Sequence, residues 1–308
     1  MPYSTHIQSN HLYSVFFAPR GYRRMAEAGM QIAQQYLSPF DKLIGVVGDA
    51  GAGKSMLIKG MFPGLELTND DDGVNVRPLP LLHLDDTGFC TPHTYHVDIR
   101  FEMAFTQMHV LTDAVLEAVG QGKRVIIEHF DLIYPTLGHN AHLLIGIGAE
   151  ILITRPTLFG PEPEDIRKVV YSSVKFRRMT HSAEDLCEFV LAKLDVPDYE
   201  HSDVRHGFIL GFADKPDIDI SALEAEVLEM ISQDLPISYH DDMHIMLGEH
   251  RHLCTGPRMH VKTTGEIKGF RLLPQMFVDP ITKQHLLVGL VGSASEERIS
   301  DLNKIIMG

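Results

Sequence analysis

The sequence predicts two successive units, an α/β unit in residues 1–160 and an α+β unit in residues 161–308. In the first part, short apolar runs alternate with segments of helical period, which is typical of a parallel sheet with helices on both faces. The stretch "GPEPEDI", residues 160–166, combines two prolines with three acids and marks a boundary. Beyond it, the helical and strand-like segments follow an α+β pattern.

The composition is that of a soluble globular protein, with 44% hydrophobic and 22% charged residues in a chain of 308. No apolar run reaches the ~20 residues of a membrane helix, and the N-terminus lacks the basic and apolar regions of a secretory signal. Three separated cysteines suit a reducing compartment. We expect a cytoplasmic protein without a membrane partner. A net charge of -14 also argues against a broad nucleic-acid surface, so any tRNA contact must be local.

The elements of the first unit follow from its periodicity. Residues 20–37 have an amphipathic helical pattern, and "LIGVVG", residues 43–48, is a continuous apolar run of the kind found in buried parallel strands. Further strands are predicted at residues 79–84, 124–130 and 149–156, and a further helix at residues 103–122.

The second unit has a different pattern. Helices are predicted at residues 167–194 and 221–233, and strands near residues 206–212, 258–262, 268–279 and 285–291. No internal repeat is evident.

A glycine-rich stretch, "VVGDAGAGKSMLIKG", follows the first apolar run. Its spacing of Gly48, Gly53, Lys54 and Ser55 fits GxxxxGK[ST], the phosphate-binding P-loop. In such a loop, backbone N–H groups surround the phosphates, the lysine reaches the β- and γ-phosphates and the serine hydroxyl binds Mg²⁺. The alternative is a glycine-rich turn with a surface lysine. The sequence thus predicts ATP or GTP with Mg²⁺ as ligand, bound by Gly48, Asp49, Ala50, Gly51, Ala52, Gly53, Lys54, Ser55 and Met56.

Candidate catalytic carboxylates stand where two predicted strands end. "LLHLDD" places Asp85 and Asp86 at the carboxyl edge of the sheet, and "VIIEHFD" places Glu128 there. Open α/β sheets bind their ligands at this edge, and phosphoryl transfer needs one carboxylate near the metal and another as base. Alternatively, these side chains only cap the helices that follow.

The order of "GDAGAGKS", "HLDDTGF" and "VIIEHFDLIYPTL" resembles that of uridine-kinase-like P-loop phosphotransferases, over residues 41–160. The resemblance implies that Asp85 or Asp86 is the general base and Glu128 the carboxylate on the metal side. The chain departs from the family pattern because Thr87 and Gly88 separate the acids from Phe89.

A second candidate site lies in "YHDDMHIMLGEHRHLCTGPRMH", which holds five of the 18 histidines together with Cys254. Zinc takes imidazole and thiolate ligands in groups of three or four. His240 and His244, four residues apart, could share one face of a helix. A solvated histidine-rich loop is the alternative.

Two flanking segments sharpen this hypothesis. "CTGPRMHVKTTGEIKGFRLL" resembles the motif that closes the second additional domain of alanyl- and threonyl-tRNA synthetases, and "RRMTHSAEDLCEFVLAKL" resembles the HxxxH helix of that domain. The resemblance spans residues 167–308. It implies an editing-type domain that hydrolyses mischarged aminoacyl-tRNA at a zinc ion, with His181, Asp185, Cys254 and His260 as ligands.

The chain departs from that family in two ways. Asp185 stands where the family has its second histidine, and Cys254 and His260 are six residues apart instead of four. A retained fold without metal or hydrolysis is therefore an alternative.

Three functions remain open from the sequence. The first is an ATP-binding protein that acts in trans on aminoacyl-tRNA, or recognises it or its amino acid. The second is a small-molecule kinase. The third is an ATP-driven accessory protein that docks a protein partner and has no deacylase activity.

Overall fold

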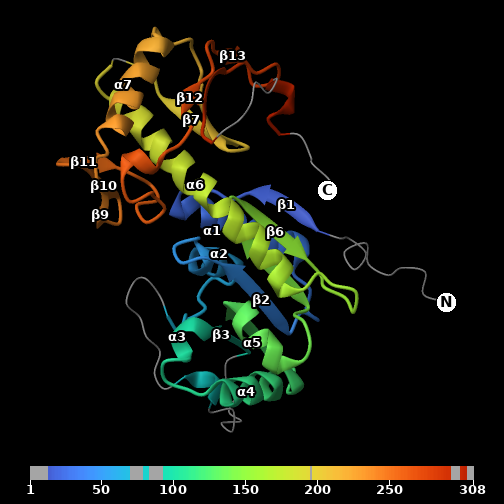
Figure 1. Ribbon diagram of the computed structural model, residues 1–308. Coiled ribbons are helices and arrows are strands. Elements are labelled where there is room, and N and C mark those ends of the chain that lie inside the picture. Colours follow the sequence, from blue (N-terminus) through green and yellow to red (C-terminus); the bar gives the residue numbers. More distant parts are fainter. Residues whose placement is uncertain (1–12, 70–78, 83–92, 195, 293–298, 304–308) are drawn as a thin grey trace. The chain divides into compact units, whose positions relative to one another are not determined.

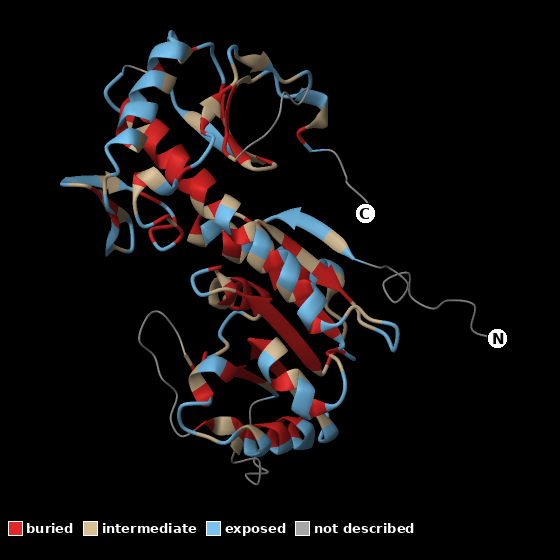
Figure 2. Cartoon of the chain, in the orientation of Figure 1, coloured by how far each residue is buried: buried red, intermediate tan, exposed pale blue. Residues whose placement is uncertain are grey.

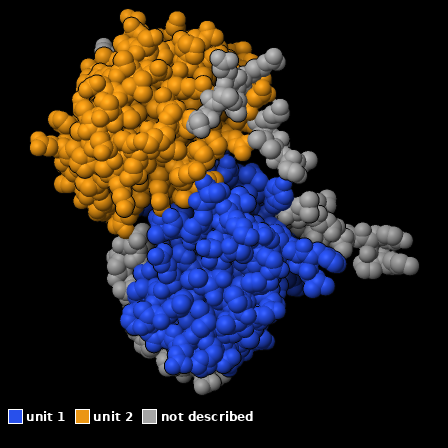
Figure 3. All heavy atoms as spheres, viewed as in Figure 1, with its two compact units in different colours: residues 1–18, 22–172 blue, residues 19–21, 173–308 orange. Residues whose placement is uncertain are grey.

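The protein is described from a computed structural model that covers residues 13–69, 79–82, 93–194, 196–292 and 299–303. It is a mixed α/β chain that divides into two compact units, shown in two colours in Figure 3. The first unit comprises residues 1–18 and 22–172, and the second comprises residues 19–21 and 173–308. The units therefore divide within helix α6 (Pro163–Leu191; Figure 1), later than the predicted boundary. Pro163 fits the first turn of a helix, so this proline-rich stretch begins α6.

The first unit is built on one six-stranded sheet in the order β1-β6-β5-β2-β4-β3. Its strands are β1 (Ser14–Phe17), β2 (Leu43–Gly48), β3 (Thr94–Asp98), β4 (Arg124–Glu128), β5 (Leu143–Ile147) and β6 (Glu150–Thr154). Its helices are α1 (Tyr22–Tyr36), α2 (Lys54–Met61), α3 (Ile99–Glu102), α4 (Met108–Gly120) and α5 (Phe130–Leu137), followed by the start of α6.

The sheet is mixed, whereas the sequence predicted a parallel one. Strands β3, β4, β2 and β5 run parallel, but β6 is antiparallel to β5, and β1 is antiparallel to β6. Only Gly148 and Ala149 separate β5 from β6, and so short a connection joins antiparallel strands.

Helices cover both faces of this sheet. Strand β2 is buried along its whole length (Figure 2), and its side chains alternate between two cores. Leu43 and Val47 pack with residues of α4, α5 and α6, whereas Ile44 and Val46 pack with residues of α1 and α2. The central strand is thereby shielded from water on both sides, and its carboxyl end, Gly48, opens into the glycine-rich loop.

Two glycines let α1 and α2 approach closely. A Cβ atom on Gly29 would lie 2.2 Å from the carbonyl oxygen of Leu57, and one on Gly60 would lie 2.0 Å from that of Ala26. We expect Gly60→Ala to lower the free energy of unfolding by about 1–3 kcal/mol or more, because backbone must move to admit the methyl group. Gly120→Ala is the control, since its Cβ would meet nothing within 4 Å. Equal melting temperatures of the two variants would contradict this packing.

The second unit contains the rest of α6, helix α7 (Ile220–Ser232) and two antiparallel sheets. One sheet consists of β9 (Ile237–Asp241), β10 (His244–Leu247) and β11 (His250–Leu253). The other consists of β7 (Tyr199–Val204), β8 (Gly207–Phe212), β12 (Arg271–Leu272), β13 (Phe277–Val278) and β14 (His285–Leu290). Its apolar core joins α6 and α7 to both sheets.

Some predicted elements are wrong. A 3₁₀ helix, Pro80–Leu82, replaces the start of the strand predicted at residues 79–84, and residues 258–262 contain no strand. His240 and His244 lie on β9 and β10, on either side of a tight turn, and not on one helix face. Among the described residues, no helix combines the length and apolar character that crossing a bilayer requires.

Candidate functional sites

The glycine-rich loop has a backbone that only glycine adopts readily at two of its positions. Gly51 and Gly53 have φ angles of 74° and 90°, in the left-handed region that favours glycine. Gly48 leaves no room for a side chain, because its Cβ would lie 2.9 Å from the Ile147 carbonyl oxygen. Helix α2 then begins at Lys54 without a side-chain cap, so its N-terminal N–H groups face the loop. Each glycine of the motif thus has a structural reason.

Lys54 and Ser55 converge on Glu128, at the carboxyl end of β4. The Ser55 hydroxyl donates to a Glu128 oxygen at 3.1 Å, and the Lys54 ammonium lies 3.7 Å from the other oxygen. Lys54 also donates to the Asp49 carbonyl at 3.1 Å. Although burial opposes ionisation, His96, Lys54 and Ser55 hold the pKa of Glu128 below its ordinary value. The carboxylate is therefore charged and lies beside the serine that the motif assigns to a metal.

Strand β3 adds two side chains that sequence reasoning missed. The backbone N–H of Thr68 donates to Nδ1 of His96, so Nε2 carries the proton and donates to Glu128 at 3.1 Å. Asp98 is the register partner of Glu128 at the same sheet edge and accepts from the side chain of Asn69 at 3.0 Å. The signal was the alternating "TYHVD" ending in an acid, which is a strand pattern.

His129, the residue after Glu128, has a left-handed φ of 56° and is 5% exposed. Burial and the nearby Lys54 charge lower its pKa. The left-handed conformation is strained for a non-glycine residue, and such strain is often retained at functional sites. The predicted bases, Asp85 and Asp86, lie outside the described residues.

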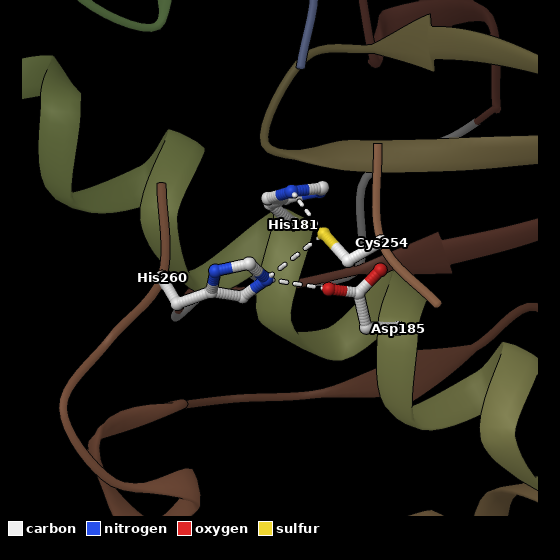
Figure 4. A group of neighbouring side chains, drawn as sticks. All are labelled: His181, Asp185, Cys254 and His260. Carbon is white, nitrogen blue, oxygen red and sulfur yellow. Dashed lines mark hydrogen bonds and ion pairs between the residues drawn. The ribbon is translucent and has the colours of Figure 1, made fainter. Parts of the chain in front are cut away.

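The second candidate site brings together the four predicted metal ligands (Figure 4). His181 and Asp185 lie one turn apart on α6, and Cys254 and His260 come from the irregular segment after β11. One ligand atom from each of the four lies within 4.8 Å of the others. The lengthened spacing between Cys254 and His260 is accommodated by a loop with a turn at Gly256–Met259.

The distances test whether the group fits zinc. Nε2 of His181 and Nε2 of His260 lie 3.4 and 3.6 Å from the Cys254 sulfur. Bond lengths of zinc to nitrogen and sulfur give a tetrahedral edge of about 3.6 Å. The His260–Asp185 contact, 2.5 Å, is a hydrogen bond and would lengthen by about 1 Å on metal binding. The backbone N–H of Gly256 donates a hydrogen bond to the Cys254 sulfur at 3.3 Å, a contact that stabilises a thiolate. The residues fit zinc.

Burial sets the protonation of these ligands. It raises the pKa of the Cys254 thiol far above its ordinary value, with help from Asp185, and it lowers the pKa of His260. The pKa of Asp185 is lowered because His181 and the His260 hydrogen bond outweigh burial. Only a cation would keep the thiol ionised here.

A buried cluster of charged side chains lies next to His181, on the side away from Cys254. Arg20 donates from Nε to Glu184 at 2.7 Å and also pairs with Asp203. Glu184 lies 3.7 Å from Nδ1 of His181, the nitrogen not facing Cys254. Nδ1 has no hydrogen-bond partner among the described residues, so Glu184 faces it as a charge and not as a hydrogen-bonded ligand partner.

We expect Arg20→Met to lower the free energy of unfolding by about 3–5 kcal/mol, because it leaves buried carboxylates without their counter-charge. Lys193→Met is the matched control, since its pair with Glu226 is half exposed and contributes at most about 1 kcal/mol. Denaturant unfolding of both variants measures the difference. A smaller loss in Arg20→Met than in Lys193→Met would contradict the assignment.

The other histidines of the segment 239–260 are not part of this group of four. His240 is half exposed, and His244 pairs with Asp241 at 2.7 Å. Of the histidines in this segment, His252 belongs to a second group of potential metal ligands, which also contains Asp185 and Glu188.

Comparisons with known proteins add little to this geometry. No family model and no curated protein matches the chain, whereas fourteen chains among the solved structures do. One is an acetylornithine aminotransferase from Elizabethkingia anophelis, at 10% identity and a TM-score of 0.24. The match covers 72% of this chain and 65% of that one, so the chain spans less than two thirds of that enzyme. So low a TM-score does not indicate a shared fold and carries no argument about either site.

Proposed function

We propose that the first unit binds a purine nucleoside triphosphate with Mg²⁺. The observation that carries this proposal is the convergence of Lys54 and Ser55 on the ionised Glu128, at the end of a loop in which Gly51 and Gly53 have left-handed backbone conformations. The sheet order, with the loop strand β2 between β5 and β4, puts the loop and Glu128 on adjacent parallel strands. This supports a P-loop arrangement.

Each residue has a distinct role in this proposal. The N–H groups of the loop and of the first turn of α2 hold the β-phosphate, and Lys54 moves from Asp49 to the phosphates. Ser55 and Glu128 would hold Mg²⁺, either directly or through water. His96 keeps Glu128 oriented.

Ser55→Ala tests the metal role. It removes one oxygen from the Mg²⁺ position, so we expect affinity for ATP to fall several-fold in Mg²⁺ but to change little in EDTA. Titration calorimetry under both conditions measures this. An equal loss with and without Mg²⁺ would contradict the role.

We further propose that zinc holds the second unit together and that this unit recognises the aminoacyl end of a tRNA, or its amino acid. Four protein ligands fill a tetrahedron, and closed sites of this kind are structural, whereas hydrolytic zinc keeps an open position. Recognition rests on the resemblance of residues 167–308 to editing domains. His181, Asp185, Cys254 and His260 would hold the zinc ion, whose positive charge would keep Cys254 ionised and whose ligands would link α6 to the loop after β11.

Alanine tRNA mischarged with serine or glycine tests this part. We expect the protein to bind it with little release of the amino acid, with or without Mg-ATP. Release that disappears in a Cys254→Ala variant would instead establish a zinc-dependent deacylase. Failure to bind the charged tRNA or the free amino acids would favour the accessory role, in which the unit docks a protein partner.

A further inference from the structure

Beside the four proposed zinc ligands lies a second group of side chains with metal-binding chemistry. Glu184 and Asp185 are adjacent residues of α6, and Glu188 follows about one turn later. Arg20 neutralises Glu184, whereas Asp185 and Glu188 repel one another and have no arginine or lysine partner among the ion pairs of the described residues. His252, on the neighbouring strand β11, is the third member of their group.

The geometry of this group suits a cation. One ligand atom from each of Asp185, Glu188 and His252 lies within 4.8 Å of the others. Nε2 of His252 is buried and has no hydrogen-bond partner within the described part of the chain. An orphaned buried nitrogen costs free energy, which a ligand would recover. This observation is independent of the carboxylates.

We propose that Asp185, Glu188 and His252 bind a second divalent cation, with Asp185 shared between this ion and zinc. A carboxylate has two oxygens and can serve two cations. Only the shared role of Asp185 rests on the proposed zinc site; the second cation site does not otherwise depend on it. Asp185, Glu188 and the Cys254 thiolate supply three negative charges for the two ions. Three protein ligands also leave coordination positions open, unlike the four around zinc.

The donor set indicates the kind of ion. Two carboxylates and one imidazole favour a harder cation such as Mn²⁺, whereas thiolate favours zinc. The competing account is that Glu188 only forms an ion pair with His201, whose Nδ1 lies 3.2 Å from a Glu188 oxygen and is hydrogen-bonded to Glu184. That account predicts no second ion.

Mn²⁺ added to the zinc-loaded, nucleotide-free full chain tests the proposal, because the Mg²⁺ position at Ser55 and Glu128 is proposed to fill together with a nucleotide. Bound Mn²⁺ loses the sharp paramagnetic resonance signal of the free ion, so the spectrum counts the binding sites. We expect one Mn²⁺ per chain, with zinc retained. Glu188→Gln and His252→Gln should each weaken Mn²⁺ binding by about 10–100-fold and keep one zinc, which shows that the fold is intact. Glu249→Gln, in the exposed turn between β10 and β11, and His240→Gln, exposed on β9, are the matched controls.

The outcomes separate the two sites. No bound Mn²⁺, displacement of zinc by Mn²⁺, or affinity unchanged in both Glu188→Gln and His252→Gln would overturn the second site. If the chain holds no zinc but still binds Mn²⁺ through Glu188 and His252, the zinc proposal fails and the second site stands.

Discussion

Lys54→Met is expected to weaken Mg-ATP binding by about 10–100-fold. A charge-assisted hydrogen bond contributes about 1.5–3 kcal/mol, and each 1.4 kcal/mol is a tenfold change in affinity. Lys54 is 6% exposed, and its ammonium lies between the Asp49 carbonyl and Glu128, beside the glycine-rich loop, from which it would move to the phosphates. Titration calorimetry with Mg-ATP gives the change.

Lys168→Met is the matched control for this substitution, because Lys168 is an exposed residue of α6 within the first unit. We expect its affinity for ATP to equal that of the unmodified protein. Equal affinities of the Lys54 and Lys168 variants would show that the loop does not bind the phosphates through Lys54.

Cys254→Ser is expected to abolish zinc binding and to lower the melting temperature of the second unit. Structural zinc sites contribute folding free energy directly, about 10–16 kcal/mol in isolated zinc-finger peptides. The effect here is smaller, because α6 and both sheets share an apolar core without the metal. Elemental analysis and calorimetric melting measure the two quantities.

The other described cysteine provides the control. Cys187 is 0% exposed, packs in the apolar core of the second unit and belongs to none of the potential metal-ligand groups among the described residues. Cys187→Ala should lower the free energy of unfolding, because it leaves a cavity in the core, but it should keep one zinc per chain. Retention of zinc in Cys254→Ser would contradict the proposed ligand set.

Local patterns predicted the elements that form the first site. The continuous apolar run before Gly48 and the glycine spacing after it needed no distant information, because each depends on its own backbone. Glu128 was predicted as a candidate because a strand pattern ends there. Asp98 and His96 were missed because β3 follows a stretch without a clear period, and their role depends on register with β4.

Long-range pairing explains the other errors. Nothing near Arg20 indicates that it pairs with Glu184, 164 residues later. His240 and His244 fit a helix by spacing, but the hairpin that holds them is set by pairing of β9 with β10. The metal group was predicted only through the resemblance, since its members come together through the packing of α6 against the segment after β11.

Binding of ATP to the unmodified protein tests the central claim most directly. In a calorimetric titration with Mg²⁺ present, the account predicts one nucleotide bound per chain and weaker binding when EDTA replaces Mg²⁺. Absence of binding of both ATP and GTP at millimolar concentration, by a folded chain, would contradict it.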